Sequence, residues 1–209
     1  MKEINKILDI LQNTYPDAEC ELNYTTPFEL LIATILSAQC TDVRVNKVTK
    51  ELFQKYNTPK DFASLSVEEI GQEIKSCGLY KSKSQKIKDT SKNLCDMYKG
   101  EVPNKLEELV KLPGVGRKTA NVVLSNAFNQ DAMAVDTHVF RVANRIGMVN
   151  TTTPEKTEFA LMEVIPKKRW SHSHHLLIFH GRRQCKARNP ECKTCTIKEY
   201  CKYYRSKVD

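Results

Sequence analysis

Four cysteines stand close together near the end of this 209-residue chain, and their thiolates could bind a metal centre. They are Cys185, Cys192, Cys195 and Cys201, with the spacing C-x6-C-x2-C-x5-C. Four thiolates satisfy zinc, but zinc sites generally pair two close-set cysteines with two more at a distance. One compact loop that supplies all four suits a bulkier iron–sulfur cubane. The spacing therefore indicates a metal centre and leaves the choice between zinc and iron open.

The remaining cysteines and a group of histidines indicate no second metal site. The rings of His172, His174 and His175 would scatter around a helix, so we expect structural or solvated roles for them. In a reducing compartment the other thiols do not form disulfides, and we expect them to be buried or half-buried. These cysteines are Cys20, Cys40, Cys77 and Cys95.

A turn in the second half of the chain has the composition of a phosphate-binding segment. Leu112–Gly116 contains one proline and two glycines, which allow close approach of a ligand to the backbone. The helix expected after it would present backbone N–H groups and the positive end of its dipole. A plain turn between helices also favours glycine, but the basic pair that follows makes this pattern more specific. We expect DNA contacts, in the manner of a helix–hairpin–helix motif, at Gly114, Val115, Gly116 and Arg117.

Lys118 follows this turn and could act as an amine nucleophile. The simpler alternative is one more phosphate contact, because an unperturbed lysine is almost entirely protonated at pH 7. The helix dipole, the neighbouring Arg117 and partial burial would each favour the neutral amine that a nucleophile requires.

Asp136, in Val135–His138, is a second candidate for chemistry. The simpler interpretation is an N-cap for the helix that would run through Val139 and Ile146. A capping carboxylate is also fixed in place, and it could stabilise positive charge that develops on a sugar ring. The spacing alone leaves both roles open.

The elements that must position these residues are predicted to be helices. Strand signals are nearly absent, and Phe28–Leu36 is apolar almost all round, as in a buried helix. Helical patterns at Lys105–Lys111 and Arg117–Phe128 flank the phosphate-binding turn. The fold class is therefore all-α, with helix starts at Thr26–Pro27, Thr58–Pro59, Ser66–Glu69, Asn104–Glu107 and Thr153–Pro154.

The composition limits the classes of protein to which this chain can belong. The length allows one large domain or two small ones, and 40% hydrophobic with 28% charged residues excludes a disordered chain or a membrane protein. No signal peptide is evident, so we expect a cytoplasmic protein, and a monomer by default.

Residues 182–205 hold eight basic and two acidic residues, and so carry most of the net charge of +8. A nucleic acid is the first partner that such an imbalance suggests.

The chain resembles the endonuclease III family over nearly its whole length. The resemblance rests on three features that follow one another in the same order: the hairpin with its lysine, the Val-Asp-Thr-His segment and the set of four cysteines. That resemblance implies a DNA glycosylase and AP lyase of base excision repair, with Lys118 as nucleophile and Asp136 as catalytic aspartate. It also implies a 4Fe–4S cluster on the four cysteines. The implied reaction removes oxidised pyrimidines from duplex DNA through a Schiff base and then cleaves the abasic site on its 3′ side by β-elimination.

The resemblance also implies an architecture. A helical barrel of about residues 21–131, with its helix–hairpin–helix at about 105–128, would face a cluster domain made from residues 1–20 and 132–209. The cluster loop would be 185–201, and double-stranded DNA with a damaged base or an abasic site would lie in the groove between the domains. We expect the protein to associate with the nucleoid through this DNA.

Further DNA contacts follow from the same resemblance. Gln39 matches a residue that fills the gap left by an extruded nucleotide, and Leu79 one that wedges into the base stack. The simpler alternatives are that Gln39 only lies at the end of a helix without a further role, and that Leu79 makes the hydrophobic contact of a helix C-cap. Lys81 and Cys40 depart from the asparagine and alanine common in the family, which bears on lesion preference. In the basic segment 182–205, called the basic loop below, we expect phosphate contacts at Arg188 and Lys193.

Two other functions compete with this prediction. An adenine-mismatch glycosylase would share the hairpin and the cluster, but such enzymes lack the lysine and carry a further C-terminal domain. A non-catalytic DNA-binding module stabilised by a metal would lack Lys118 or Asp136, and both are present.

Overall fold

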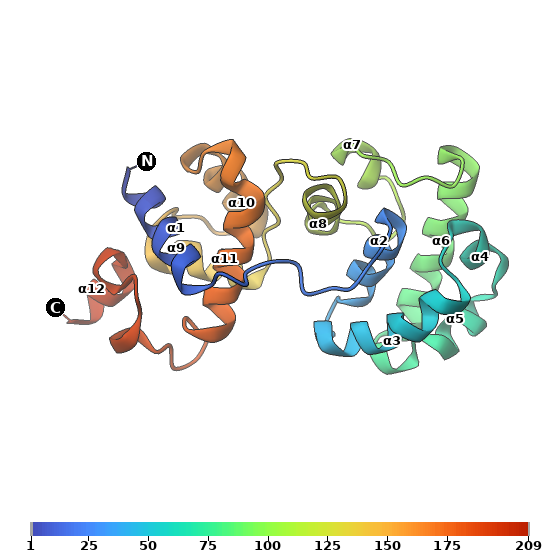
Figure 1. The fold of residues 1–209 in the computed structure, drawn as a ribbon, viewed down its shortest axis with the longest axis horizontal. Helices are drawn as coiled ribbons and strands as arrows, with labels where there is room; N and C mark the ends of the chain where they lie inside the picture. The colour runs from blue at the N-terminus through green and yellow to red at the C-terminus, as the bar shows by residue number, and fades with distance from the viewer. Residues whose placement is uncertain (1, 209) are drawn as a thin grey trace. The chain divides into compact units, whose positions relative to one another are not determined.

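The computed structural model describes residues 2–208, and within that range the chain forms helices and turns without a strand (Figure 1). The predicted all-α class is confirmed. None of the helices in this range is long and apolar enough to cross a bilayer. The chain divides into two compact units: one is Glu21–Gln130, and the other combines the segment up to Cys20 with the segment from Asp131 onward.

The unit Glu21–Gln130 is built around a buried helix. Its helices are α2 (Pro27–Leu36), α3 (Asp42–Lys55), α4 (Pro59–Ser64), α5 (Val67–Glu73), α6 (Tyr80–Tyr98), α7 (Leu106–Leu109) and α8 (Arg117–Ala127). Every residue from Phe28 to Leu36 is buried, as the apolar run predicts. Helix α2 packs against α3, α6 and α8, while α6 also packs against α4 and α5. The two helices that carry the candidate DNA contacts, α6 and α8, therefore rest on one core.

The second unit joins the N-terminal helix to the C-terminal part of the chain. Its helices are α1 (Lys2–Thr14), α9 (Thr137–Ile146), α10 (Pro154–Val164), α11 (Trp170–Arg183) and α12 (Lys202–Val208). Helix α11 packs against α1 and α9, and both α10 and α12 pack against α9. The core contains Leu8, Leu11, Val139 and Leu176 among its fully buried residues. Two 3-10 turns, Cys192–Thr194 and Lys198–Tyr200, lie in the cysteine loop.

Most of the predicted helix starts are present. The hydroxyl of Thr26 accepts a hydrogen bond from the Glu29 backbone N–H at 3.2 Å, and Pro27 occupies the first helical position. Ser66 and Glu69 form a complete capping box. Thr58 and Thr153 likewise cap α4 and α10 ahead of a proline.

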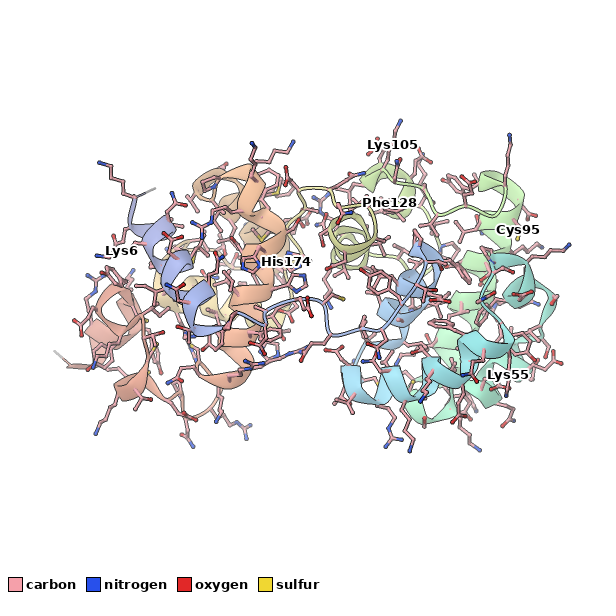
Figure 2. The ribbon with its side chains drawn as sticks, in the orientation of Figure 1. Lys6, Lys55, Cys95, Lys105, Phe128 and His174 are labelled. Atoms are coloured by element: carbon pink, nitrogen blue, oxygen red, sulfur yellow. The ribbon has the colours of Figure 1, made fainter. Side chains whose placement is uncertain are left out.

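The predicted start at Asn104–Glu107 is wrong. Helix α7 begins at Leu106, its N-cap is Lys105 (labelled in Figure 2), and no side chain caps it. The Asn104 carbonyl instead accepts a hydrogen bond from the Gln130 side chain at 2.7 Å, which keeps this segment in a loop. The helix also ends at Leu109 rather than Lys111, because the proline–glycine turn follows directly.

The histidines and the scattered cysteines have the environments expected of structural side chains. His174 on α11 is completely buried (Figure 2), and its Nδ1 accepts a hydrogen bond from the Ala134 N–H at 3.5 Å. Burial lowers the pKa of His175 to about 4, so this ring is neutral at pH 7. The four cysteines outside the loop form no disulfide and are buried or half-buried: Cys20, Cys40, Cys77 and Cys95.

Candidate active site and metal centre

The hairpin turn between α7 and α8 is fixed from within its own unit. The Val115 N–H donates to the Leu112 carbonyl at 3.1 Å, and the hydroxyl of Thr90 on α6 donates to the Pro113 carbonyl. The Val115 side chain is buried, so only its backbone is available to a ligand. The turn is therefore a rigid support for the N-terminus of α8.

The two glycines of the turn differ in what they require. Gly114 has a φ of +77°, and a Cβ there would lie 2.9 Å from the side-chain carbons of Lys86. Gly116 has a φ of −89°, it is the N-cap of α8, and no atom lies within 4 Å of a Cβ built on it. No side chain caps α8, so its N-terminus can accept an external anion.

Lys118 lies in the first turn of α8, and its side chain is exposed. The partial burial expected for it is not found. The buried face of α8 is formed by residues further along the helix, which include Ala120, Val123 and Leu124, and these turn the lysine outward. The amine is thus accessible to a substrate.

Asp136 lies in the other unit, and its Oδ1 caps α9 by accepting a hydrogen bond from the Val139 N–H at 2.8 Å. The N-cap role is therefore present, and the side chain remains partly exposed. Burial lowers the pKa of the nearby His138, and the charge of Asp136 opposes that shift. The carboxylate is held in one position by the backbone of its own helix.

A chain of contacts runs from this end of α9 to the cysteine loop. His138 Nδ1 accepts a hydrogen bond from Arg141 Nη2 at 3.2 Å. The same guanidinium group donates to the carbonyls of Gly181 at 2.9 Å and Cys185 at 3.0 Å. One arginine thus connects a residue close to the candidate aspartate with the first cysteine of the loop.

Arg145, one turn further along α9, holds the next part of the loop. Its guanidinium donates to the carbonyls of Lys186 at 2.7 Å and Ala187 at 2.9 Å, and lies 3.6 Å from Cys185 Sγ. Its own carbonyl accepts from the Cys201 thiol at 3.5 Å. The sequence analysis missed both arginines, although a basic pair at i and i+4 beside the apolar stripe of α9 was a usable signal.

The side chains of the four loop cysteines line a common cavity. Burial raises the pKa of Cys195 and of Cys201, since the charged thiolates are desolvated there. Within residues 2–208, no three His, Cys, Asp or Glu side chains form a group that could hold a single metal ion. The loop thus brings all four thiols to the wall of one cavity.

His180, a residue that the sequence analysis missed, also lines this cavity. Burial lowers its pKa to about 4 and raises the pKa of Tyr15 to about 12, so both side chains are neutral at pH 7. The Tyr15 hydroxyl lies 3.0 Å from His180 Nδ1, and His180 Nε2 lies 3.8 Å from Cys195 Sγ. If the hydroxyl donates to Nδ1, the proton on Nε2 points at the sulfur.

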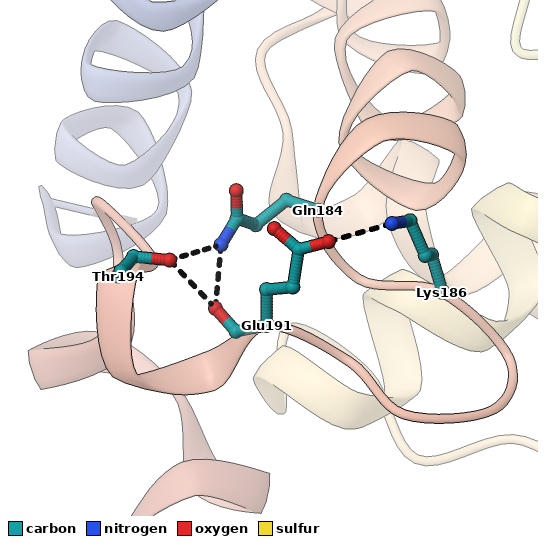
Figure 3. A network of polar contacts seen from close by, with 4 residues as sticks. All are labelled: Gln184, Lys186, Glu191 and Thr194. Atoms are coloured by element: carbon teal, nitrogen blue, oxygen red, sulfur yellow. Dashed lines mark hydrogen bonds and ion pairs between the residues drawn. The ribbon is translucent and has the colours of Figure 1, made fainter.

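The loop is closed by polar contacts of its own (Figure 3). The Gln184 amide donates to the Glu191 carbonyl and to the Thr194 hydroxyl, and Lys186 pairs with the Glu191 carboxylate at 2.6 Å. Because these contacts join both ends of the Gln184–Thr194 segment, the irregular backbone has a defined conformation.

The basic residues of the loop region fall into two groups. Arg183 pairs with Asp17 through both guanidinium nitrogens, at 3.0 and 2.6 Å, as Lys186 does with its glutamate. Arg188 and Lys193 are exposed, and within residues 2–208 neither forms an ion pair. These two charges are therefore available to an external anion.

Gln39 and Leu79 both belong to the unit Glu21–Gln130, and both are exposed. Leu79 keeps 56% of its surface accessible, and Gly78 is the C-cap of the preceding 3-10 turn. Gln39 lies in the turn after α2. Both side chains can reach a partner.

The sequence pattern of one superfamily matches residues 32–167, and it is described as the HhH-GPD superfamily base excision DNA repair protein. Endonuclease III of Bacillus subtilis is 51% identical, over 97% of this chain and 93% of that protein. Endonuclease III of Rickettsia conorii is 52% identical, over 96% of each. A solved structure of a trapped endonuclease III–DNA covalent intermediate superimposes with a TM-score of 0.94, at 49% identity, over 100% of this chain and 98% of that one.

A helical fold with a hairpin of this kind defines a DNA glycosylase of the helix–hairpin–helix class. The chain belongs to the HhH-GPD superfamily and, within it, to the endonuclease III family, which confirms the resemblance noted in the sequence. It is a base excision repair enzyme of the DNA glycosylase and AP lyase class.

The two glycines of the hairpin give the first testable prediction. Gly114→Ala should lower the free energy of unfolding by about 1–3 kcal/mol, because the new Cβ meets Lys86 and φ is positive. Gly116→Ala is the matched control and should lower it by less, about 0.5–1 kcal/mol, since its Cβ meets no atom and only the preference for glycine over alanine at an N-cap is lost. Urea unfolding of both variants measures the difference, and equal losses would contradict it.

Proposed function

We propose that this enzyme removes oxidised pyrimidines from double-stranded DNA and cleaves the resulting abasic site on its 3′ side, with Lys118 as the nucleophile. The observation that carries the proposal is the exposed lysine in the first turn of a helix whose N-terminus has only a glycine as its cap. The endonuclease III structure with a covalent DNA intermediate supports it, because such an intermediate requires a nucleophile on the protein.

Binding precedes the chemistry. The N-terminus of α8 and the backbone of Gly114 and Gly116 hold the phosphates of the damaged strand. The damaged nucleotide leaves the base stack, since its sugar carbon is otherwise unreachable. Leu79 wedges into the stack and Gln39 fills the gap, which requires the exposure that both side chains have.

The reaction then proceeds in two stages. The neutral Lys118 amine attacks C1′, the bond from C1′ to the base breaks, and the base leaves with a proton. Asp136 stabilises the positive charge that develops on the sugar. The C1′–O4′ bond of the sugar ring then breaks, O4′ takes up a proton, and a protonated imine forms between the lysine nitrogen and C1′. This imine acidifies the C2′–H bond; loss of that proton forms a C2′–C3′ double bond and breaks the bond from C3′ to the phosphate oxygen. Water finally hydrolyses the imine and restores the lysine.

We also propose that Cys185, Cys192, Cys195 and Cys201 hold a 4Fe–4S cluster. Zinc sites generally pair two close-set cysteines with two more at a distance. Here one compact loop supplies all four thiolates to the wall of one cavity, which suits a bulkier cluster with one iron for each thiolate. When bound, it supplies iron–sulfur bonds that join the two ends of the loop. Arg141 and Arg145 fix the loop backbone beside it.

In this proposal the cysteine loop belongs to a cluster domain, residues 1–20 and 132–209, and residues 21–131 form the barrel domain. Arg188 and Lys193 present their charges to DNA phosphates from that loop. The protein acts as a monomer on the DNA of the cytoplasmic nucleoid. The departures at Lys81 and Cys40, which flank the lesion-facing turns, affect lesion preference.

The role of Lys118 is tested by Lys118→Gln. If the lysine is the nucleophile, binding to a duplex with an abasic site should persist, while strand cleavage and borohydride trapping disappear. If it is only a phosphate contact, binding should weaken by about 1 kcal/mol or a little more. Gel-shift titration and trapping on the same duplex separate the two, and trapped adduct at normal yield would identify another amine as the nucleophile.

Asp136→Asn is the companion variant in that experiment. Base removal should slow, because the charge that stabilises the sugar is absent, whereas some trapping should remain on pre-formed abasic DNA. The asparagine oxygen can still cap α9, so the free energy of unfolding should change little. Full-rate base removal by a folded Asp136→Asn variant would exclude the carboxylate from the reaction.

The metal centre is tested by iron analysis. Protein purified without oxygen should contain about four iron atoms per chain and show visible absorption. Cys201→Ser should lower the iron content, and Cys95→Ser, which removes a thiol of the other unit, should leave it unchanged. Stoichiometric zinc without iron would overturn the assignment.

The basic loop is tested by charge reversal. The double variant Arg188→Glu and Lys193→Glu should weaken binding to all duplexes alike. It should also reduce the slope of log K against log salt by about 0.9 for each phosphate that the protein no longer neutralises. Reversal of two exposed lysines on other helices, Lys60 and Lys92, is the control. An unchanged slope in the folded loop variant would remove the loop from the interface.

A further inference from the structure

The two turns that carry Gln39 and Leu79 share an unfavourable backbone conformation. Gln39 has a φ of 54° and Leu79 a φ of 49°, both in the left-handed region. Residues with a Cβ occupy this region at a cost of about 1–2 kcal/mol, so surrounding contacts must hold them there. The structure offers one side chain that contacts both turns.

That side chain is Lys83, which lies in the first turns of α6 and is only 3% exposed. Its ammonium donates to the Leu36 carbonyl at 2.8 Å and to the Cys77 carbonyl at 2.7 Å. Leu36 is the last residue of α2 and precedes the Gln39 turn, and Cys77 directly precedes Gly78 and Leu79. One buried cation therefore joins the backbone on both sides of the space between the turns.

The partners of this ammonium are two backbone carbonyls from different segments of the chain. Burial lowers the pKa of Lys83, and the Cys40 and Cys77 side chains oppose the shift. Two carbonyls thus converge on one buried amine. For stability alone, an apolar side chain of similar volume would serve as well or better, so the buried charge indicates a positional role.

We infer that Lys83 is a positioning residue that fixes the spacing between the Gln39 turn and the Leu79 turn, so that both side chains enter the same lesion in double-stranded DNA together. This inference rests on the proposed function, in which those two side chains contact DNA. It assigns no chemical step to Lys83, which touches neither the sugar nor the base.

The experiment compares two lysines of the same helix. Lys88 also lies on α6 and also donates to two carbonyls, those of Ala63 and Leu65, but these belong to α4 and its C-terminal end. Lys83→Met and Lys88→Met therefore remove similar hydrogen bonds, and only the first removes them from the DNA-contacting turns. Each variant is titrated with a duplex that contains a tetrahydrofuran abasic analogue and with the undamaged duplex.

Lys83→Met should bind the abasic-analogue duplex about tenfold more weakly and the undamaged duplex within about twofold of the wild type. Lys88→Met should leave both affinities, and hence the lesion preference, unchanged. With 2-aminopurine opposite the lesion, Lys83→Met should also lose the fluorescence change that reports entry of the two side chains into the stack. Lys83→Arg, which can donate to both carbonyls, should restore at least part of the preference.

The outcomes separate the inference from the proposed function. If Leu79→Ala and Gln39→Ala abolish the lesion preference while Lys83→Met retains it, the positioning role is wrong and the DNA contacts stand. If Leu79→Ala and Gln39→Ala retain the preference, the DNA contacts themselves are wrong. Should Lys83→Met not fold, Lys83→Gln, an uncharged side chain one atom shorter, takes its place, with Lys88→Gln as its control. Loss of the lesion preference and of the fluorescence change in Lys83→Gln alone supports the positioning role, and a retained preference, or equal losses in both variants, overturns it.

Discussion

An irregular loop cannot form all the hydrogen bonds that its own backbone requires, and this constraint organises the unit that contains the cysteines. Between the end of α11 and the start of α12 the chain has only two short 3-10 turns, so many of its carbonyls lack partners in regular structure. Arg141 and Arg145 supply donors from one helix, α9. The same helix is capped by Asp136. A single ten-residue helix therefore places both the candidate aspartate and the loop that would hold the cluster.

In the other unit, too, side-chain donors from one helix form hydrogen bonds with backbone carbonyls of irregular segments. Thr90 donates to the Pro113 carbonyl of the hairpin, and Lys83 donates to the backbone near the Gln39 turn and the Leu79 turn. Both donors lie on α6, which packs against α2, α4 and α5. The buried side chains of one long helix thus position segments whose own side chains point outward. The side chains of these segments can be exposed because the residues that fix their backbone are buried.

Local rules predicted the parts of this structure that depend on neighbours in the sequence, and they missed contacts between distant segments. The buried run of α2 and its cap at Thr26 need only a few adjacent residues, and the close spacing of the four cysteines agrees with the cavity that their thiols line. The failure at Asn104 has a tertiary cause, because Gln130 binds its carbonyl. The spacing of Arg141 and Arg145 could mark them as a basic pair beside the apolar stripe of α9, but nothing near Arg141 in the sequence indicates that its partner is a carbonyl 44 residues away. Lys83 was missed because lysine is almost never fully buried, and only two carbonyls that converge in space make its charge tolerable there.

The exposure of Lys118 bears on how the proposed nucleophile would share its surroundings with DNA. Its side chain is accessible to water, so the amine is open to a substrate. The turn before it offers groups of another kind: Gly116 is the N-cap of α8, no side chain caps that helix, and its first N–H groups are open to an anion. A capping side chain at this position would occupy the same N–H groups. In the proposed complex the phosphates would therefore be held at the backbone of the hairpin, and the lysine would remain for the sugar.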